Sequence, residues 1–267
     1  MNQQSKLSNY QLYADRIREL TDDQLKNIDY LINHLTIEKN DKVRVIYCPF
    51  EWQNPQAKLM IIGITPGPTQ LRNALTAFRS AIRQGLDEQQ VLKVTKLAGA
   101  FSGDLRINLV KLLDVVGLHK YAGVPTCESF FGTHSHLVHT TSLISNATFL
   151  LDGTPYNGTP NPMKNDLLRK QIFDGLLHQI SVAKDALLLP LGPTVDKAIQ
   201  ELCEQGLIDP KRVLFGMPHP GGQNGERVKY FLGQKKAEIC SIKTNTALLD
   251  SRKKEIMNKI SVLQTTV

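Results

Sequence analysis

Two glycine- and proline-rich segments in this sequence follow directly after apolar runs. Residues 63–67 read Gly-Ile-Thr-Pro-Gly, and residues 219–225 read His-Pro-Gly-Gly-Gln-Asn-Gly. Glycine has no side chain, so backbone N–H groups in such segments approach phosphate oxygens closely. These residue types therefore predict a site for a ligand that carries phosphate.

The elements that must position these segments alternate between strands and helices. Residues 58–63 form a continuous apolar run, typical of a parallel strand covered on both faces. Further strands are expected at residues 136–144, 186–191 and 213–217. Amphipathic stretches of helical spacing occupy residues 71–84, 88–97, 105–116, 165–182 and 195–205. We predict an α/β fold, a three-layer α/β/α sandwich with a central, mainly parallel four-stranded sheet.

Each expected strand leads into a Gly- or Pro-rich segment. These segments are residues 63–68, 152–162, 192–193 and 219–225. In open parallel sheets, ligands bind at the carboxyl ends of the strands. Four such loops at one edge of one sheet are the strongest physical indication of a site.

The chain divides into three expected regions. These are an N-terminal helical segment (1–40), an α/β domain (41–242) and a basic C-terminal helical tail (243–267). Within the first region, Thr21 precedes two aspartates and a glutamine, which predicts that it caps the start of a helix.

Composition restricts the class of protein. With 267 residues, 41% hydrophobic and 21% charged, the chain can bury a large core. It has no apolar run of membrane-spanning length, and its polar N-terminus lacks a signal core, so we expect a cytoplasmic protein without a membrane partner. The four cysteines lie far apart without a C-x-x-C pair, which predicts reduced thiols and no metal site. The net charge of +7 is compatible with a polyanionic partner but does not establish one.

The order of the motifs resembles the uracil-DNA glycosylase superfamily. In that superfamily a G-x-(D/N/A)-P loop follows an early strand, and an H-P or N-P loop follows the last strand. Residues 98–105 and 112–118 resemble the stretch that carries its base-stacking aromatic and the next helix, and residues 188–192 resemble its third strand. The resemblance covers roughly residues 45–240 and marks this chain as a divergent member.

The resemblance implies a monofunctional DNA glycosylase. Such an enzyme flips a damaged or modified base out of DNA, here uracil or a modified cytosine, and hydrolyses its N-glycosidic bond to leave an abasic site. The setting would be DNA repair or anti-phage defence. The implied partner is DNA, with no obligate protein partner and a monomeric state. No cofactor is implied, because the branch with an iron–sulfur cluster shows a C-x-x-C that this chain lacks.

Matched residue by residue, the resemblance assigns the catalytic roles. His219 would donate to the departing base, and Thr65 occupies the position of the water-activating residue. The superfamily commonly has an acid or an amide there, and a threonine hydroxyl orients water but is no general base at neutral pH. A carboxylate would then come from elsewhere, with Asp152 our first choice and Asp104 our second, or dissociation would run with little base assistance.

The remaining implied residues bind the base and the DNA. The base-binding group is Ile64, Phe101 as the stacking residue, Ser142 and Asn146. The DNA-binding group is Pro66, Gly67, Gly221, Gly222, Gln223, Asn224 and Arg227. Gln223 stands where the superfamily often has a leucine wedge, and Ser142 stands near the position of its polar base-reading residue.

These departures leave two other classes of function open. The first is a non-catalytic nucleic-acid-binding module on the same fold. The second is an unrelated α/β enzyme for a small phosphorylated ligand, because glycine-rich strand ends suit any phosphate.

Overall fold

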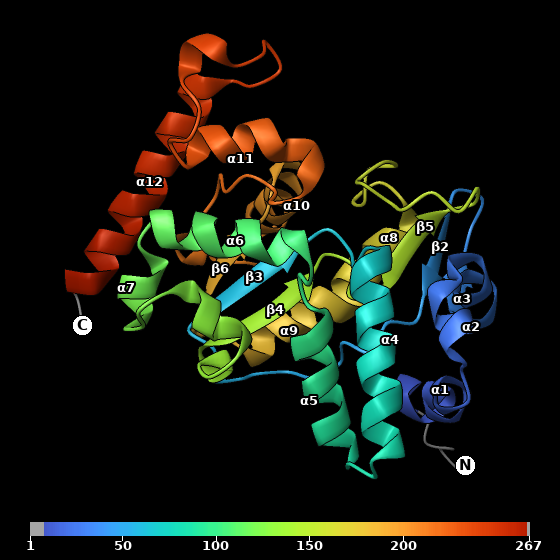
Figure 1. Ribbon diagram of the computed structural model, residues 1–267. Coiled ribbons are helices and arrows are strands. Elements are labelled where there is room, and N and C mark those ends of the chain that lie inside the picture. Colours follow the sequence, from blue (N-terminus) through green and yellow to red (C-terminus); the bar gives the residue numbers. More distant parts are fainter. Residues whose placement is uncertain (1–7, 266–267) are drawn as a thin grey trace. The chain divides into compact units, whose positions relative to one another are not determined.

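The computed structural model, shown in Figure 1, describes residues 8–265. Its contacts divide the chain into two units. Unit 1 comprises Met1–Trp52, Thr65–Ala100 and Ile144–Gln171. Unit 2 comprises Gln53–Ile64, Phe101–Leu143 and Ile172–Val267. Each unit therefore draws on three separate stretches of the chain.

The helices of unit 1 are α1 (Asn9–Arg18), α2 (Asp22–Lys26), α3 (Ile28–Leu35), α4 (Pro68–Arg83), α5 (Glu88–Gly99) and α8 (Asp166–Gln171). Among them, α1, α2, α3 and α5 begin at capping side chains. The predicted cap at Thr21 is confirmed: its hydroxyl accepts the backbone N–H of Gln24 over 3.2 Å, and the Gln24 side chain accepts the Thr21 N–H over 2.9 Å. The Asn27 side chain accepts the Tyr30 N–H over 3.0 Å and caps α3, so α2 and α3 are separate helices.

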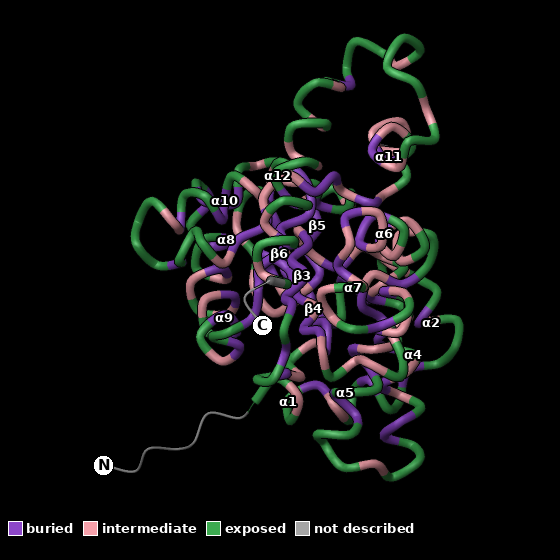
Figure 2. Tube along the Cα trace, turned by 90° about the vertical axis from the view of Figure 1, so that its left-hand side faces the viewer, coloured by how far each residue is buried: buried purple, intermediate pink, exposed green. Residues whose placement is uncertain are grey.

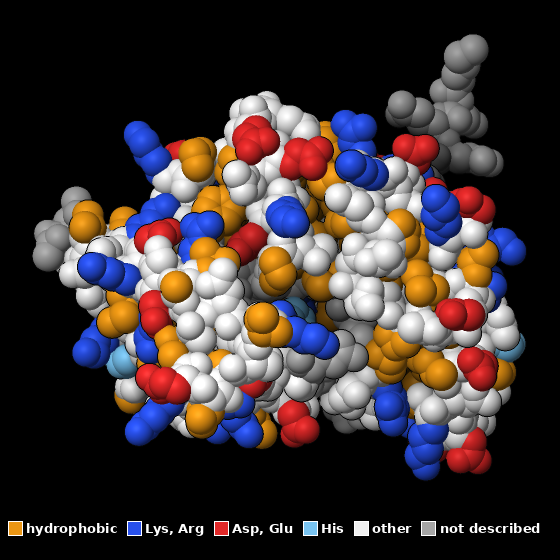
Figure 3. All heavy atoms as spheres, turned by 90° about the horizontal axis from the view of Figure 1, so that it is seen from above, with side chains coloured by type: hydrophobic (Ala, Val, Ile, Leu, Met, Phe, Trp, Pro, Cys, Tyr) orange, Lys and Arg blue, Asp and Glu red, His pale blue; other side chains and the backbone are white. Residues whose placement is uncertain are grey.

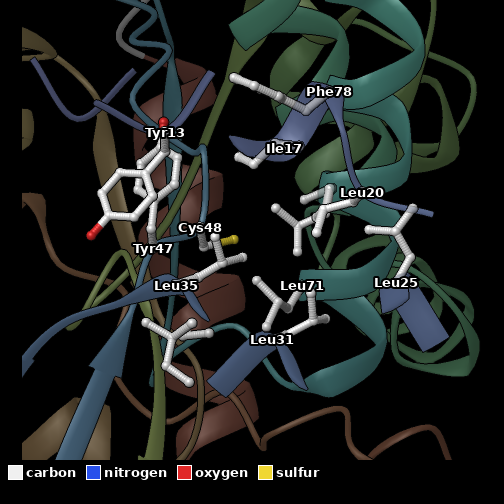
Figure 4. Packing of buried hydrophobic residues seen from close by; sticks show 14 of the residues in the cluster. Tyr13, Ile17, Leu20, Leu25, Leu31, Leu35, Tyr47, Cys48, Leu71 and Phe78 are labelled. Carbon is white, nitrogen blue, oxygen red and sulfur yellow. The ribbon is translucent and has the colours of Figure 1, made fainter. Parts of the chain in front are cut away.

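Unit 1 also holds an antiparallel sheet that the sequence did not predict. Its strands are β1 (Thr36–Lys39), β2 (Val43–Ile46) and β5 (Ala147–Leu150), in the order β1-β2-β5. Helix residues cover it with a hydrophobic core, shown in Figure 4, in which Tyr13 stacks on Tyr47 with ring centroids 4.6 Å apart.

A lysine is buried within unit 1. Only 1% of Lys96 is exposed, and its Nζ donates to the backbone carbonyls of Trp52 (2.7 Å) and Phe50 (3.2 Å). Burial lowers the pKa of Lys96 from 10.5 to about 7. The ammonium thus satisfies two carbonyls of the turn before β3, at the cost of its own hydration.

Unit 2 is built on a parallel sheet. Its central strand β3 (Leu59–Gly63) pairs with β4 (Val138–Ser142) on one side and β6 (Leu187–Pro190) on the other. All five residues of β3 are buried, as the apolar run predicts, and Figure 2 shows these strands in purple. The mixed α/β class and the parallel sheet are therefore confirmed.

The prediction of a single four-stranded sheet was wrong, because residues 8–265 form two sheets of three strands each. Residues 213–217 were expected to be the fourth parallel strand. They run beside β6 through only two isolated bridges, Leu188 to Val213 and Leu191 to Met217. Gly216, with φ at 101°, leaves the extended conformation between the bridges and interrupts the ladder.

Helices and short turns surround this second sheet. They are α6 (Asp104–Val115), α7 (Leu118–Ala122), η1 (Cys127–Phe131), η2 (Ser135–Leu137), η3 (Ile172–Leu176), α9 (Leu177–Val182), α10 (Pro193–Glu204), η4 (Pro210–Arg212), η5 (Gly222–Asn224), α11 (Gly225–Phe231), η6 (Ala237–Ile239) and α12 (Thr246–Thr265). The helix expected at residues 165–182 is interrupted by η3, a π-helical turn. Within residues 8–265, no helix has both the length and the apolar character needed to cross a bilayer.

Candidate functional site

The predicted loops of unit 2 begin at the carboxyl edge of the parallel sheet. Gly63 and Ser142 are register partners at the ends of β3 and β4. The Leu191 N–H donates to the Ile62 carbonyl over 2.9 Å, and the Gly192 N–H donates to the Met217 carbonyl over 2.8 Å. Neighbouring strands lie about 4.8 Å apart, so the loops that follow these residues start close to one another.

At this edge Phe101 packs directly on Gly63. A Cβ atom added to Gly63 would lie 3.2 Å from Phe101 Cε1 and 3.3 Å from Ser142 Oγ. Among the described residues, Phe101 is the non-glycine residue with positive φ, at 50°, a conformation of elevated energy. The structure thus brings together an aromatic ring and a hydroxyl, two of the residues predicted to bind a base, above a glycine.

His219 lies on the same edge between two glycines. A Cβ at Gly192 would be 2.9 Å from His219 Cβ, and one at Gly221 would be 2.9 Å from His219 Cε1 and Nδ1. The Gly221 N–H donates to His219 Nδ1 over 3.0 Å. Burial lowers the pKa of His219 below its ordinary value of 6.5, so the ring is neutral at pH 7. Since Nδ1 accepts, the single ring proton of this neutral tautomer is on Nε2, which acts as a donor.

Helix α6 links Phe101, which precedes it in the chain, with the loop that carries His219, which it contacts through Asn108. It begins three residues after Phe101, and its Asn108 donates through Nδ2 to the Pro220 carbonyl over 3.0 Å. Asp104, the first residue of α6, lies one turn before Asn108 and on the same face of the helix. Its side chain is exposed.

Asn108 was not identified from the sequence. It lies between two apolar residues in an amphipathic stretch, where a polar side chain normally faces solvent. Its spacing of four residues from Asp104 is the signal that would have marked a shared polar face.

The loop after His219 is held by side chains of α6 and α11. The Asn224 side chain accepts from Arg227 Nη1 over 2.8 Å, and Arg227 Nη2 donates to the Lys243 carbonyl over 3.0 Å. Gly221 uses its N–H on His219, whereas a Cβ at Gly222 would meet nothing within 4 Å. The side chain of Gln223 lies outside the described part of the structure.

In unit 1, Thr65 and Asn146 contact each other. The Thr65 hydroxyl donates to the Asn146 carbonyl over 2.7 Å and lies 3.3 Å from Thr148 Oγ1. The Asn146 side-chain oxygen accepts the Cys48 N–H over 3.0 Å. Both side chains are thus engaged in holding the strands of unit 1, and the Thr65 proton is committed to a carbonyl.

The other predicted residues near Thr65 have structural partners as well. Pro66 is buried, and the Gly67 N–H donates to the Gln70 side chain over 3.2 Å at the start of α4. Ile64 is half-buried at the end of a unit 2 segment. In this conformation the Gly67 N–H is therefore hydrogen-bonded within the protein and is not offered to a phosphate.

Asp152 is an exposed turn residue of unit 1. Its Oδ1 accepts the Thr154 N–H over 2.8 Å, and this hydrogen bond lowers the pKa of Asp152 below its ordinary value. A lower pKa makes the carboxylate a weaker base. The structure thus gives this carboxylate the role of closing the turn after β5.

The thiols and other metal-binding side chains are dispersed. All four cysteines are free, and Cys48 and Cys127 are buried. Across residues 8–265, no three side chains of His, Cys, Asp or Glu are grouped as metal ligands.

Fold and site define a mixed α/β protein with a neutral histidine at the carboxyl edge of a parallel sheet. No protein-family model matches the chain. It is 30% identical over 240 residues to a protein of Bacillus subtilis (strain 168) described as "Uncharacterized protein YoxB", and the match covers 89% of this chain and 93% of that protein. The chain belongs to the YoxB family.

Proposed function

We propose that this protein is a DNA glycosylase related to the uracil-DNA glycosylase superfamily, which excises a damaged or modified base by hydrolysis. The observation that carries the proposal is the state of His219. Its neutral ring has Nδ1 occupied by the Gly221 N–H, which leaves Nε2–H as a hydrogen-bond donor on the same edge of the sheet as Phe101 and Ser142.

In the proposed reaction, the flipped base stacks on Phe101 and hydrogen-bonds to Ser142. As the glycosidic bond breaks, its electron pair goes to the base and positive charge develops on the sugar. His219 Nε2–H donates to the base oxygen on which the negative charge accumulates. One preorganised donor of this kind contributes about 3 kcal/mol to the transition state.

For the water that attacks the sugar we propose Asp104 as the orienting carboxylate. It lies on the face of α6 that also carries Asn108, whose side chain holds the residue next to His219. Asp152, by contrast, makes its hydrogen bond within a turn of unit 1. Thr65 then acts as a structural residue that positions the loop before α4, since its hydroxyl donates to Asn146.

The charge of the chain supports a polyanionic partner. The net charge is +7, and on the face in Figure 3 the Lys and Arg side chains are interspersed with Asp and Glu. On that face the attraction for DNA is therefore spread widely. We propose that backbone groups of the 219–225 loop, Gly222 among them, supply the closer phosphate contacts.

An abasic-site assay tests the proposal. Purified protein is incubated with oligonucleotides that carry uracil, hypoxanthine or oxidised bases, and with phage DNAs that carry modified cytosines, and hot alkali then cuts any abasic sites. We expect cleavage of at least one substrate by the wild type and none by His219→Ala, with DNA affinity unchanged within about threefold. Full activity of His219→Ala would overturn its assigned role.

A second candidate is a non-catalytic nucleic-acid-binding module. It is favoured by Thr65, whose position carries no carboxylate and whose hydroxyl is committed to Asn146. This function requires salt-dependent DNA binding without release of any base across the whole panel.

A further inference from the structure

Helix α10 begins against the backbone of His219. Its N-cap is Gly192, and a Cβ atom added there would lie 2.9 Å from His219 Cβ and 3.5 Å from the His219 backbone nitrogen. The Gly192 N–H also donates to the carbonyl of Met217, two residues before His219, over 2.8 Å. The position of the histidine backbone therefore depends on how the start of α10 and residues 213–219 are held together.

Asp196, in the first turn of α10, links these two segments. Its backbone N–H donates to the Gly192 carbonyl over 3.0 Å. Its carboxylate accepts the Gly216 N–H, over 3.1 Å at Oδ2 and 3.4 Å at Oδ1. These hydrogen bonds and the peptide unit from Gly216 to Met217 form a closed ring beside His219.

The Asp196 carboxylate supplies a hydrogen bond that a regular strand would receive from its neighbour. Residues 213–217 meet β6 through two isolated bridges, and Gly216, with φ at 101°, leaves the extended conformation between them. An amide that leaves a ladder needs another acceptor, and Asp196 provides it. On its other side Gly216 packs on Arg252 of α12, because an added Cβ would lie 2.6 Å from Arg252 Cβ. Residues of α10 and α12 thus hold this segment where the sheet does not.

Asp196 also lines a cavity of about 390 Å³. The other walls include Gln200 and Cys203 of α10, Phe215, and Arg252 of α12. The Asp196 side chain is half-buried. A small solute in this cavity therefore has access to the Gly216 N–H when the carboxylate is removed.

We propose that Asp196 is a positioning residue for His219. Its carboxylate holds the Gly216 N–H and so keeps the segment that carries the histidine against Gly192. This inference rests on the proposed glycosylase function and deepens it. The effect passes through the backbone, so loss of the carboxylate should slow the chemical step and leave the affinity for DNA unchanged.

The first test compares Asp196→Ala with Asp196→Asn in single-turnover base release, on the substrate that the abasic-site assay identifies. Alanine suits a helix but removes the acceptor, and we expect it to lower the rate constant roughly tenfold to a hundredfold. Asparagine keeps an acceptor oxygen and should stay within about threefold of wild type. Anisotropy of labelled DNA should give an affinity within about threefold of wild type for both variants.

The matched control is Glu204→Ala in the same helix. Glu204 is exposed, and its carboxylate accepts from Gln200 of α10 over 3.2 Å. We expect its rate constant to equal that of the wild type. Thermal unfolding of each variant shows that the fold is retained.

Chemical rescue gives a second readout that lost stability would not produce. Formate has the carboxylate that Asp196→Ala lacks and is small enough for the cavity beside Gly216. We expect formate to restore part of the base release in Asp196→Ala, whereas chloride at the same ionic strength restores none. Formate should leave the wild-type rate unchanged.

The NMR signals of the His219 ring distinguish this inference from the proposed function, because they need no substrate. Assigned with His219→Gln, they should shift in Asp196→Ala and return in Asp196→Asn. Wild-type rates and signals in Asp196→Ala, or a loss that neither asparagine nor formate restores, would overturn the positioning role. Absence of base release by the wild type would overturn the proposed function, and the ring signals would then decide whether Asp196 positions His219.

Discussion

The Nδ1 atom of His219 and the backbone nitrogen of Gly221 lie 3.0 Å apart, and the residue between them is Pro220. This single hydrogen bond decides which ring nitrogen carries the proton. The neighbouring glycines also leave no room for a Cβ atom on either side of the histidine. The orientation and protonation of the His219 ring therefore depend on Gly192 and Gly221, which have no side chains that could react.

The close approach of Gly221 gives a sharp test. Gly221 has φ at −68°, which alanine also adopts, but the added Cβ would lie 2.9 Å from the imidazole and displace it. We expect Gly221→Ala to lower kcat/KM for base release roughly tenfold to a hundredfold, since small displacements of a reacting group have effects of that size. Gly175→Ala, in η3 and outside the candidate site, adds a Cβ that meets nothing and should retain wild-type turnover. Equal rates for the two variants would contradict the assigned role of the histidine.

The pH dependence of turnover follows from the lowered pKa of His219. Protonation puts a hydrogen on Nδ1 and breaks the bond from Gly221, so the neutral ring is the active form. The pKa lies below 6.5 in the folded protein. We therefore expect kcat/KM to be constant just above pH 6.5 and to decrease as the pH falls through the lowered value.

The same shift links protonation to folding. The stability that the neutral ring contributes is present above pH 6.5 and is lost as the pH falls through the folded pKa.

The control for the pH dependence of turnover is a pH profile of His219→Gln, recorded over long incubations. An unchanged acidic limb in that variant would assign the titration to another group.

Asp104 and Asp152 can be distinguished by matched amide substitutions. Asp104→Asn removes the carboxylate proposed to orient water, so we expect base release to slow roughly 10²-fold or more while DNA affinity is kept or increased. Asp152→Asn changes only a turn in unit 1 and should stay within about threefold of wild type. Single-turnover rates and anisotropy measure both effects. The reverse order of the two rates would return the role to Asp152.

Lys96 predicts a pH-dependent stability in unit 1. Lys96→Met leaves the carbonyls of Phe50 and Trp52 without their donor, which costs about 2 kcal/mol at pH 7. The lysine pKa is about 7 when folded and 10.5 ordinarily, so the unfolded chain binds more protons between these values. The stability difference between wild type and Lys96→Met should therefore increase with pH over this interval. Urea unfolding of both proteins at pH 7, 8 and 9 measures this difference in the free energy of unfolding. A difference that does not change with pH would contradict the lowered pKa of Lys96.

Much of the parallel sheet could be predicted from the sequence. The apolar run at residues 58–63 marks the buried strand β3, and helical spacing located α4, α5, α6 and α10 to within a few residues. The antiparallel sheet could not be predicted, because its strands are only four residues long and depend on pairing between distant parts of the chain. For the same reason, β1 (Thr36–Lys39) lies inside the N-terminal segment (1–40) that the sequence predicts to be helical.

The candidate site was predictable in its residue types but not in its details. Proximity of Gly63 and Ser142 follows from the pairing of two parallel strands, since both lie at the carboxyl ends of those strands, whereas Phe101 reaches them from the turn between α5 and α6. The tautomer of His219 and the use of the Thr65 hydroxyl depend on which backbone groups lie within 3 Å, and no spacing in a sequence encodes that. Whether these residues bind a base stays a prediction.

The interleaving of the two units has a consequence for how the protein can evolve. The central strand β3 comes from Gln53–Ile64, a stretch placed in the chain between two segments of unit 1. A fragment that starts at Phe101 would lack β3, and β4 and β6 would lose the partner they share. Because the stretches of the two units alternate along the chain, no single crossover between genes can exchange all of one unit and leave the other intact.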